Sequence, residues 1–291
     1  MQREIFMRRV TALATILLSA VALPVGAQGW RDNTALLVYS PRYFGPNAFP
    51  MPDLHGGRVG SRIEAEVRGE YHYYTGDRTS NLSGRFFYPF VKGRAGAEIS
   101  FIYKENYTLT PETRDERHAA DTQSPVAYEG DIVISSFFQL LEGHRALPDA
   151  VVRFSLKTAS GDRLCDARFT DAAAYWIDLA FGKDLVKSAG NSFLRIQAML
   201  GFYCWMTNDV AHRQNDAALF GGGLTGRYRR FTLSSDLSGI YGYENNGDRP
   251  LIFRNKLAFE TGNNILSACY HHGMKDRLYD TYSLSYTRCF H

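Results

Sequence analysis

The most informative absence in this 291-residue sequence is that of a long apolar run in the body of the chain. Beyond Ala27, no stretch approaches the ~20 apolar residues of a membrane-spanning helix. An excess of one charge sign is also missing, since 33 Lys and Arg residues face 30 Asp and Glu residues. Near-neutrality argues against a nucleic-acid partner, which would favour a strongly basic face. If the mature chain enters a membrane, it does so as strands.

Cysteine is scarce, and the motifs of several enzyme classes are missing. The four cysteines (Cys165, Cys204, Cys269 and Cys289) match neither a zinc site nor a redox pair in their spacing. A bridge between Cys165 and Cys204 is one alternative, and isolated small apolar residues are the favoured one. The eight histidines are dispersed, and neither HExxH nor a phosphate-binding loop occurs. We therefore expect no metal and no cofactor.

The first residues have the layout of a secretory signal peptide. Three arginines precede an apolar run over residues 10–23, and small residues occupy positions 25–27. We predict a signal peptide over residues 1–27, cleaved after Ala27; the alternative is a single N-terminal anchor helix. The leader carries a net charge of +2, so cleavage lowers the net charge from +3 to about +1.

Residues 28–60 are rich in Pro, Gly and Asn and show no sustained period. The segment 40–50 contains three prolines, which lack the N–H that a central strand donates to its neighbour. It therefore does not read as a strand. We predict a periplasmic lead-in, or a plug-like segment, that covers or enters the mouth of the following domain.

Residues 61–291 consist of successive segments with a period of two. Residues 63–73 show it most clearly, because apolar or small residues alternate with ionisable ones. The two sets are Ile63, Ala65, Val67, Gly69, Tyr71 and Tyr73, and Glu64, Glu66, Arg68, Glu70 and His72. A helix would scatter these charges around its circumference, whereas a strand places them on one face. Five ionisable groups on one face need water or partners.

Eleven further alternating segments follow, near residues 82–88, 96–107, 132–140, 152–157, 175–181, 194–202, 219–228, 231–241, 251–260, 265–272 and 278–290. Connections after the third, fifth and seventh are long and polar, and most of those after even-numbered segments are shorter. This asymmetry and the even count are typical of outer-membrane barrels. We predict an all-β antiparallel transmembrane barrel of about 12 strands (range 10–14) in contact with the lipid bilayer of a bacterial outer membrane. The alternative is a secreted β-sandwich.

The last segment alternates apolar Tyr282, Leu284, Tyr286 and Phe290 with small polar residues. It resembles the C-terminal β-signal of outer-membrane proteins, which implies the barrel-insertion machinery as a partner. Arg288, at an apolar position of the alternation, and the final His291 depart from that pattern.

A second resemblance lies in the lead-in, whose residues 43–48 read Tyr-Phe-Gly-Pro-Asn-Ala. This segment and the first predicted strand resemble functionally uncharacterised barrels of Bacteroidota. The resemblance implies a fold and a location but no activity.

The polar faces of the strands would line the barrel interior. The predicted lumen-lining residues are Glu64, Glu66, Arg68, Glu70, Arg85, Glu98, Lys104, Arg153, Lys157, Asp178, Arg195, Arg227, Asp236, Arg254, Lys256 and Glu260. Acids gather on the first and third strands and bases on the fifth to tenth. Such a lumen predicts a passive or substrate-selective channel that favours small anionic solutes.

Two other functions stay open. The lumen charges could pair into a ladder that closes the interior, leaving a structural barrel whose loops, chiefly residues 110–130 and 160–170, bind a partner or a glycan. A lipid-modifying hydrolase is the third reading, with His271, His272 and Asp280 as weak catalytic candidates. No serine lies beside these histidines to act as nucleophile, so two polar residues at the water boundary are the favoured interpretation.

Overall fold

The computed structural model describes residues 40–117, 119, 122, 129–161, 173–188, 192–206 and 214–290. The chain divides into two compact units, residues 1–32 and 33–291, and all the described residues belong to the second. The predicted signal peptide, its cleavage site and Cys165 lie outside the described residues.

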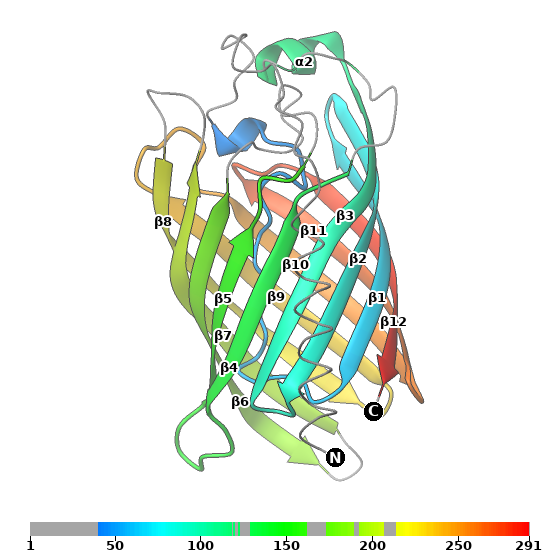
Figure 1. The fold of residues 1–291 in the computed structure, drawn as a ribbon, viewed down its shortest axis with the longest axis vertical. Coiled ribbons are helices and arrows are strands. Elements are labelled where there is room, and N and C mark those ends of the chain that lie inside the picture. Colours follow the sequence, from blue (N-terminus) through cyan, green and yellow to red (C-terminus); the bar gives the residue numbers. More distant parts are fainter. Residues whose placement is uncertain are drawn as a thin grey trace, which may run out of the picture. The chain divides into compact units, whose positions relative to one another are not determined.

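Within the described residues, twelve strands form a closed barrel (Figure 1). The strands are β1 (Ile63–Tyr74), β2 (Asp77–Val91), β3 (Ala95–Leu109), β4 (Ile132–Leu141), β5 (Asp149–Lys157), β6 (Ala174–Ser188), β7 (Ser192–Met206), β8 (Gln214–Tyr228), β9 (Phe231–Gly242), β10 (Leu251–Thr261), β11 (Asn264–Lys275) and β12 (Asp280–Phe290). Each pairs antiparallel with its neighbours in sequence, and β1 closes the ring on β12, where Ile63 lies opposite Phe290. The predicted twelve-stranded antiparallel barrel is confirmed, and the sandwich is excluded.

The alternation seen in the sequence divides the residues between the two faces of the wall. On β1, Val67, Tyr71 and Tyr73 are exposed, with 55% of the Val67 surface accessible, whereas Glu66 and His72 are buried in the interior. Successive side chains of a strand point to opposite faces, so an alternating sequence produces a wall with an apolar outside and a polar inside.

The outer face carries a belt of exposed apolar side chains on every strand. Aromatic residues mark both edges of the belt: Tyr71, Tyr73, Tyr175, Tyr241 and Tyr282 towards one end, and Phe90, Phe138, Tyr228, Phe231 and Phe290 towards the other. Two aromatic girdles around an aliphatic band are the surface of a transmembrane barrel. In the described part of the chain, no helix is long and apolar enough to cross a membrane.

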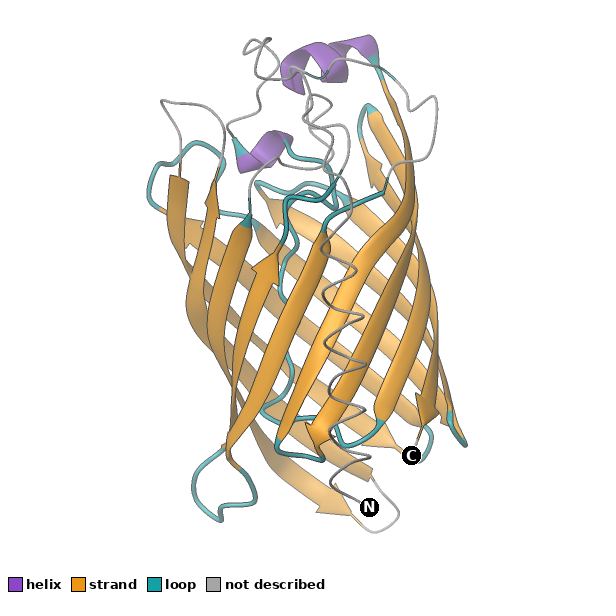
Figure 2. Ribbon diagram, in the orientation of Figure 1, coloured by secondary structure: helices purple, strands orange, loops and turns teal. Residues whose placement is uncertain are grey.

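The two ends of the barrel differ in their connections (Figure 2). We call the end at which β1, β3, β5, β7, β9 and β11 finish the outer end, and the opposite end the inner end. In chain order, the strands joined at the outer end are separated by 2, 22, 16, 7, 8 and 4 residues, and those joined at the inner end by 3, 7, 3, 2 and 2 residues. The C-terminal residues of β12 lie at the inner end (Figure 1). Helix α2 (Pro111–Arg117) follows β3 at the outer end, and the sequence pattern did not predict it.

A register shift in β3 alters the face of one predicted lumen residue. Opposite Leu82 and Ser83 of β2 lie Lys104 and Ile102, so Tyr103 is an extra residue in the ladder. Beyond it Lys104 is exposed on the outer face beside Leu82, and Glu105 is buried inside. The predicted lumen position of Lys104 is therefore wrong, because a β-bulge reverses the alternation.

Candidate functional site: a threaded lumen

The interior of the barrel is shared with residues 40–60, which we call the threaded segment (Figure 1). The segment begins with the short helix η3 (Pro41–Tyr43) at the outer end, where the Ser40 hydroxyl donates to the carbonyl of Asn246. At the inner end Arg58 forms an ion pair of 2.7 Å with Asp149, at the start of β5. The segment thus runs the length of the lumen from the outer to the inner end.

Aromatic packing holds the outer third of the threaded segment. Phe49 meets the rings of Tyr203 and Trp205 on β7, with centroids 4.9 and 4.8 Å apart. Trp176 of β6 stacks on Tyr203 with centroids 5.2 Å apart, and Phe44 belongs to the same buried cluster. These inward aromatic side chains fill the lumen beside β6 and β7.

Hydrogen bonds to backbone carbonyls hold the segment further along. Arg277, in the connection between β11 and β12, donates to the carbonyls of Pro46 and Phe49 at 2.7 Å each. Arg254 of β10 donates to the Pro52 carbonyl at 3.1 Å and pairs with Asp53 at 2.6 Å. A proline-rich segment has few N–H donors but a full set of carbonyl acceptors, which arginine satisfies from the wall.

The inner third lies directly against strand backbones. Arg195 of β7 donates to the Gly56 carbonyl at 2.8 Å and pairs with Asp149 at 2.6 Å. Gly57 has φ +74°, and a Cβ there would lie 2.4 Å from the Asp149 carbonyl oxygen. Only glycine combines that dihedral angle with that close an approach. On β6, Gly182 makes room for the segment, because a Cβ would lie 1.9 Å from the Gly56 oxygen.

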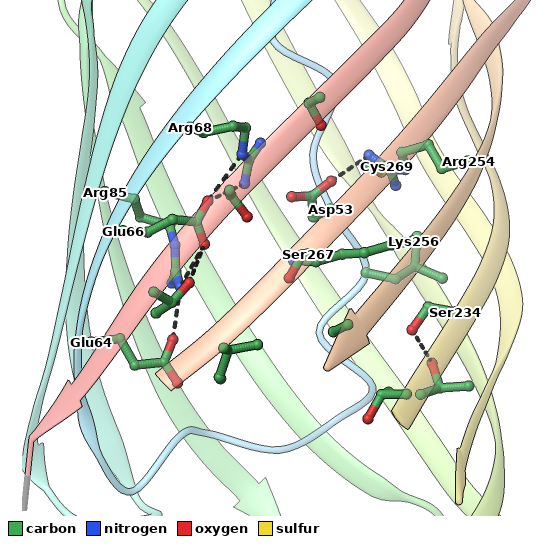
Figure 3. A pocket seen from close by; sticks show the side chains of 18 of the residues that line it. Asp53, Glu64, Glu66, Arg68, Arg85, Ser234, Arg254, Lys256, Ser267 and Cys269 are labelled. Carbon is green, nitrogen blue, oxygen red and sulfur yellow. Dashed lines mark hydrogen bonds and ion pairs between the residues drawn. The ribbon is translucent and has the colours of Figure 1, made fainter. Parts of the chain in front are cut away.

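Among the described residues, two cavities lie beside the threaded segment. Cavity 1, of about 350 Å³, lies against β1, β2 and β7 to β12 and reaches the inner end at Arg62 and Glu260 (Figure 3). Cavity 2, of about 220 Å³, extends towards the outer end as far as Pro46 and Arg277. Both cavities are lined by Asp53, Glu66, Arg68, Arg85, Arg254 and His271. We call this shared set the neck.

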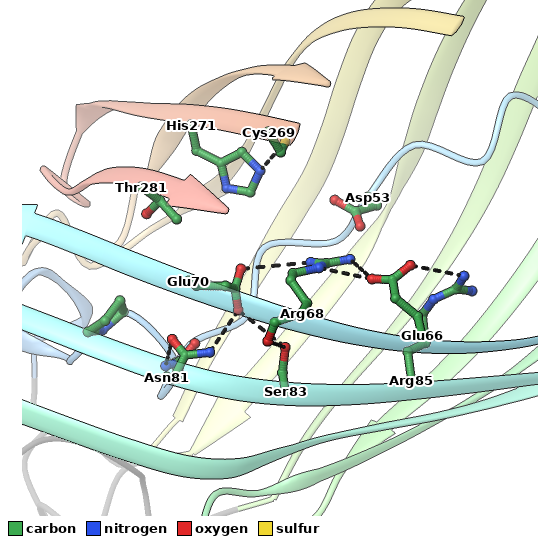
Figure 4. Close-up of polar contacts among 12 residues, drawn as sticks. Asp53, Glu66, Arg68, Glu70, Asn81, Ser83, Arg85, Cys269, His271 and Thr281 are labelled. Atoms are coloured by element: carbon green, nitrogen blue, oxygen red, sulfur yellow. Dashed lines mark hydrogen bonds and ion pairs between the residues drawn. The ribbon is translucent and has the colours of Figure 1, made fainter. Parts of the chain in front are cut away.

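Ion pairs form a chain across the neck on the β1 and β2 side (Figure 4). Glu66 lies 2.6 Å from Arg68 and 3.3 Å from Arg85, and Arg68 lies 3.8 Å from Glu70. Arg85 also reaches Glu64 at 2.7 Å. Each guanidinium here is matched by carboxylates, as burial of charge requires.

Lys256 differs from the other bases of cavity 1. Its side chain lines the cavity from β10 (Figure 3), and no hydrogen bond or ion pair ties its ammonium group to another described residue. Besides His271 and Cys269, the ionisable lining of cavity 1 comprises six Arg and Lys residues (Arg62, Arg68, Arg85, Arg227, Arg254 and Lys256) and five Asp and Glu residues (Asp53, Glu64, Glu66, Asp236 and Glu260). The formal excess of the Arg and Lys residues is one positive charge, and of these six Lys256 forms no ion pair with a described acid.

Most of the predicted lumen residues line one of these cavities: Glu64, Glu66, Arg68, Glu70, Arg85, Glu98, Arg153, Lys157, Arg227, Asp236, Arg254, Lys256 and Glu260. Asp178 and Arg195 are buried beneath the threaded segment, where Asp178 pairs with Arg153 at 2.6 Å. Acids and bases separated in the sequence thus meet as neighbours in the wall. Tertiary pairing removes most of the segregation that the sequence displays.

The sequence pattern did not identify several charged residues of the lumen. Asp53 and Arg58 lie in a segment without a period, so no pattern gave them a face. Asp149 and Asp184 continue the inward alternation of β5 and β6 at the inner end, and extending each strand by a few residues would have found them.

The three weak catalytic candidates are not brought together. His271 faces the neck, with its Nε2 atom 3.1 Å from the Cys269 sulfur. His272 is on the opposite face of β11, where its Nδ1 atom lies 2.8 Å from Asp280. Asp280 also accepts a hydrogen bond of 2.8 Å from Tyr270. His272 and Asp280 thus form a surface pair, separated from His271 by the barrel wall.

The residues of the predicted insertion signal share one face of β12. Tyr282, Leu284, Tyr286 and Phe290 are exposed on the outer surface. Arg288, which departs from the alternation, donates to the Asn264 side chain at 2.8 Å beside the inner rim. A long basic side chain at that depth reaches the polar boundary of the membrane. The role of this strand in insertion stays a prediction, and His291 lies outside the described residues.

A closed antiparallel barrel with an apolar, aromatic-edged outer belt and a charged interior defines an outer-membrane β-barrel protein. No protein-family model matches the chain, and no curated protein matches it.

Three solved structures show similar barrels. The KdgM porin has a TM-score of 0.47 at 10% identity, covering 78% of this chain and 99% of its own. The NanC porin has a TM-score of 0.46 at 10% identity, and the match covers 77% of this chain and 98% of the porin chain. The translocator domain of autotransporter NalP from Neisseria meningitidis has a TM-score of 0.46 at 10% identity, and the match covers 81% of this chain and 89% of the translocator chain. These are likenesses of architecture, and the class assignment rests on the strands and outer surface of this chain.

Proposed function

We propose that this barrel is a channel for small anionic solutes and that its path runs beside the threaded segment through cavities 1 and 2. The observation that carries the proposal is the sharing of one set of lining residues by the two cavities, one of which reaches the inner end and the other extends outwards. The neck is then the narrowest part of the path, and its charges govern which solutes pass.

The expected selectivity for anions follows from Lys256, the base in the lining of cavity 1 that forms no ion pair with a described acid. Arginines of cavity 1 are paired with carboxylates, so their fields largely cancel at the position of a passing solute. Lys256 lines the same cavity without an ion pair to a described carboxylate. A cation that no acid binds directly attracts anions in a confined passage with low-dielectric walls. We therefore expect a modest preference for anions.

A second candidate is a structural or partner-binding barrel without an open pore. The observation that favours it is the threaded segment, which is held at the outer end, in the middle and at the inner end by Arg277, Arg254 and Arg195. The two candidates differ in one measurable property, the conductance of the folded protein.

The test is conductance of purified protein in planar bilayers at about 0.1 M salt, where the Debye length is ~10 Å. The wild type is expected to give reproducible steps and a reversal potential on the anion-selective side. In Lys256→Glu, a change of two charge units at ~7 Å and a dielectric constant of ~80 corresponds to ~1.2 kcal/mol for a monovalent ion, which screening at a Debye length of ~10 Å reduces to ~0.6 kcal/mol. The change opposes an anion and favours a cation by that amount, so the anion-to-cation permeability ratio is expected to fall about sevenfold.

Lys104→Glu makes the same charge change on the outer face of β3 and is the matched control, which should keep the wild-type ratio. Absence of any conductance above the bare bilayer would decide for the closed barrel. Steps with equal selectivity in wild type and Lys256→Glu would show a path that avoids cavity 1.

A further inference from the structure

The lipid-facing wall has a hollow where β9 to β12 and β1 lie side by side. Its volume is about 740 Å³, and it is open to the outer surface. Gly69 of β1 lines it, and a Cβ on Gly69 would meet no atom within 4 Å. Ala268 of β11 is another small residue of the hollow, and the larger apolar side chains around it are Tyr71, Leu233, Leu257, Tyr270, Tyr282 and Leu284. Glu70, Asn81, Cys269 and Ser283, which alternate with outward residues on their strands, also line it.

A polar side chain interrupts the apolar surface beside this hollow. Asn255 of β10 shares the outer face with Phe253 and Leu257, its neighbours two residues away, and it lines the hollow. Its cross-strand neighbours are Ser235 of β9 and Tyr270 of β11. The amide of Asn255 makes no hydrogen bond to any described residue, and the Tyr270 hydroxyl is already bound to Asp280. An unsatisfied amide within hydrocarbon is costly.

We propose that this hollow belongs to the contact surface for a second copy of the same chain, and that the twofold axis of the contact passes beside Asn255. Hydrogen-bonding complementarity favours a second copy as the occupant. A carboxamide carries both a donor and an acceptor, so two Asn255 side chains related by a twofold axis satisfy each other. A lipid acyl chain fills the apolar space equally well but offers neither a donor nor an acceptor.

The shape of the surface agrees with a twofold contact. In such a contact, a ridge of one copy enters a hollow of the other, and the reverse occurs at the symmetry-related position. Leu284, with 71% of its surface exposed, and Leu257, with 49%, form ridges beside the hollow. Tyr270 and Tyr282, with ring centroids 5.2 Å apart, give the hollow a firm edge. Small residues that let backbones approach are the usual basis of association within a bilayer.

The experiment measures the stoichiometry of the full chain by sedimentation equilibrium in density-matched detergent and by photobleaching steps in vesicles. The wild type is expected to be a dimer. Asn255→Leu removes the amide pair and Gly69→Leu fills the hollow, so each is expected to weaken dimerisation at least tenfold. Heat-dependent mobility on SDS gels verifies that each variant is folded, and the Asn255→Leu side chain suits the lipid-facing side of a monomer.

Gly222→Leu is the control for a leucine added to the outer face. Gly222 lies on β8, and a Cβ there has the Gln197 carbonyl oxygen at 3.8 Å as its nearest contact. This variant should dimerise like the wild type. A wild type that is monomeric at all concentrations would overturn the proposal. So would dimers unaffected by Asn255→Leu, or a monomer whose co-purifying lipid is lost in Gly69→Leu. Dimerisation is tested independently of the proposed channel function, because the experiment measures stoichiometry and not conductance.

Discussion

His55 lies in the threaded segment with its ring against Phe137, centroids 4.8 Å apart, and its Nε2 atom beside the Arg153 guanidinium. Burial and the neighbouring guanidinium both disfavour a second positive charge, so the pKa of His55 lies well below its usual 6.5. The charges of Arg85 and Arg254 also lower the pKa of His55, whereas the charge of Asp53 raises it. The docked imidazole is therefore neutral and accepts a hydrogen bond from Arg153.

This arrangement predicts that acid loosens the threaded segment. A released His55 would titrate near 6.5, so release takes up a proton, and docking loses stability as the pH falls below that value. We expect channel conductance to rise between pH ~7.5 and pH ~5, within the range where histidine titrates. In His55→Gln, which keeps a hydrogen-bond acceptor but does not titrate, the rise should be smaller. An equal rise in both proteins would place the titrating group elsewhere.

At the scale of an element, the inward face of β6 is shaped to receive the threaded segment. Gly182 lies opposite Asp149 in the ladder with β5, and Arg195 reaches across it to Gly56. A side chain at Gly182 would occupy the space of the Gly56 carbonyl and of the Arg195 guanidinium. A Cβ at this position would lie 2.5 Å from the Nε atom of Arg195. A β-branched residue at Gly182 is compatible with strand β6, but it leaves no room for the threaded segment.

Gly182→Val is therefore expected to displace the inner part of the threaded segment while the barrel still closes. Asp53, three residues before Gly56, belongs to the neck, so its displacement together with the segment should widen the neck. The single-channel conductance should then increase about twofold or more, because conductance follows the cross-section of the narrowest part of the path. Gly226→Val, on the outer face of β8 with Leu194 as its nearest contact at 3.9 Å, is the control and should match the wild type. A conductance unchanged in Gly182→Val would mean that the inner part of the segment does not restrict the path.

For the whole molecule, the difference between the two barrel ends predicts its orientation in the membrane. Long connections are extracellular and short ones periplasmic in such barrels. An epitope inserted after Asp115, at the outer end, should bind antibody on intact cells. One inserted after Arg145, in the turn between β4 and β5, should bind only after the outer membrane is permeabilised. If only the epitope after Arg145 bound antibody on intact cells, the long connections would face the periplasm. The outer end of the path would then open on the periplasmic side.

The sequence alone determined the number of strands, their order and the face of most side chains. A strand's alternation is local, so eleven residues such as 63–73 suffice to show it. Lys104 was assigned wrongly because one extra residue at Tyr103 reverses the faces beyond it, and nothing in the local pattern marks the insertion.

Only the tertiary structure decided the path of the threaded segment and the state of the lumen charges. Residues 40–60 have no period, and their partners, such as Arg254 and Arg195, are 139 to 203 positions away in the chain. Ion pairing likewise depends on which strands become neighbours when the ring closes, and this is why Lys256 rather than another base is left without an acid. Periodicity is a property of adjacent residues, whereas compensation of charge is a property of the closed barrel.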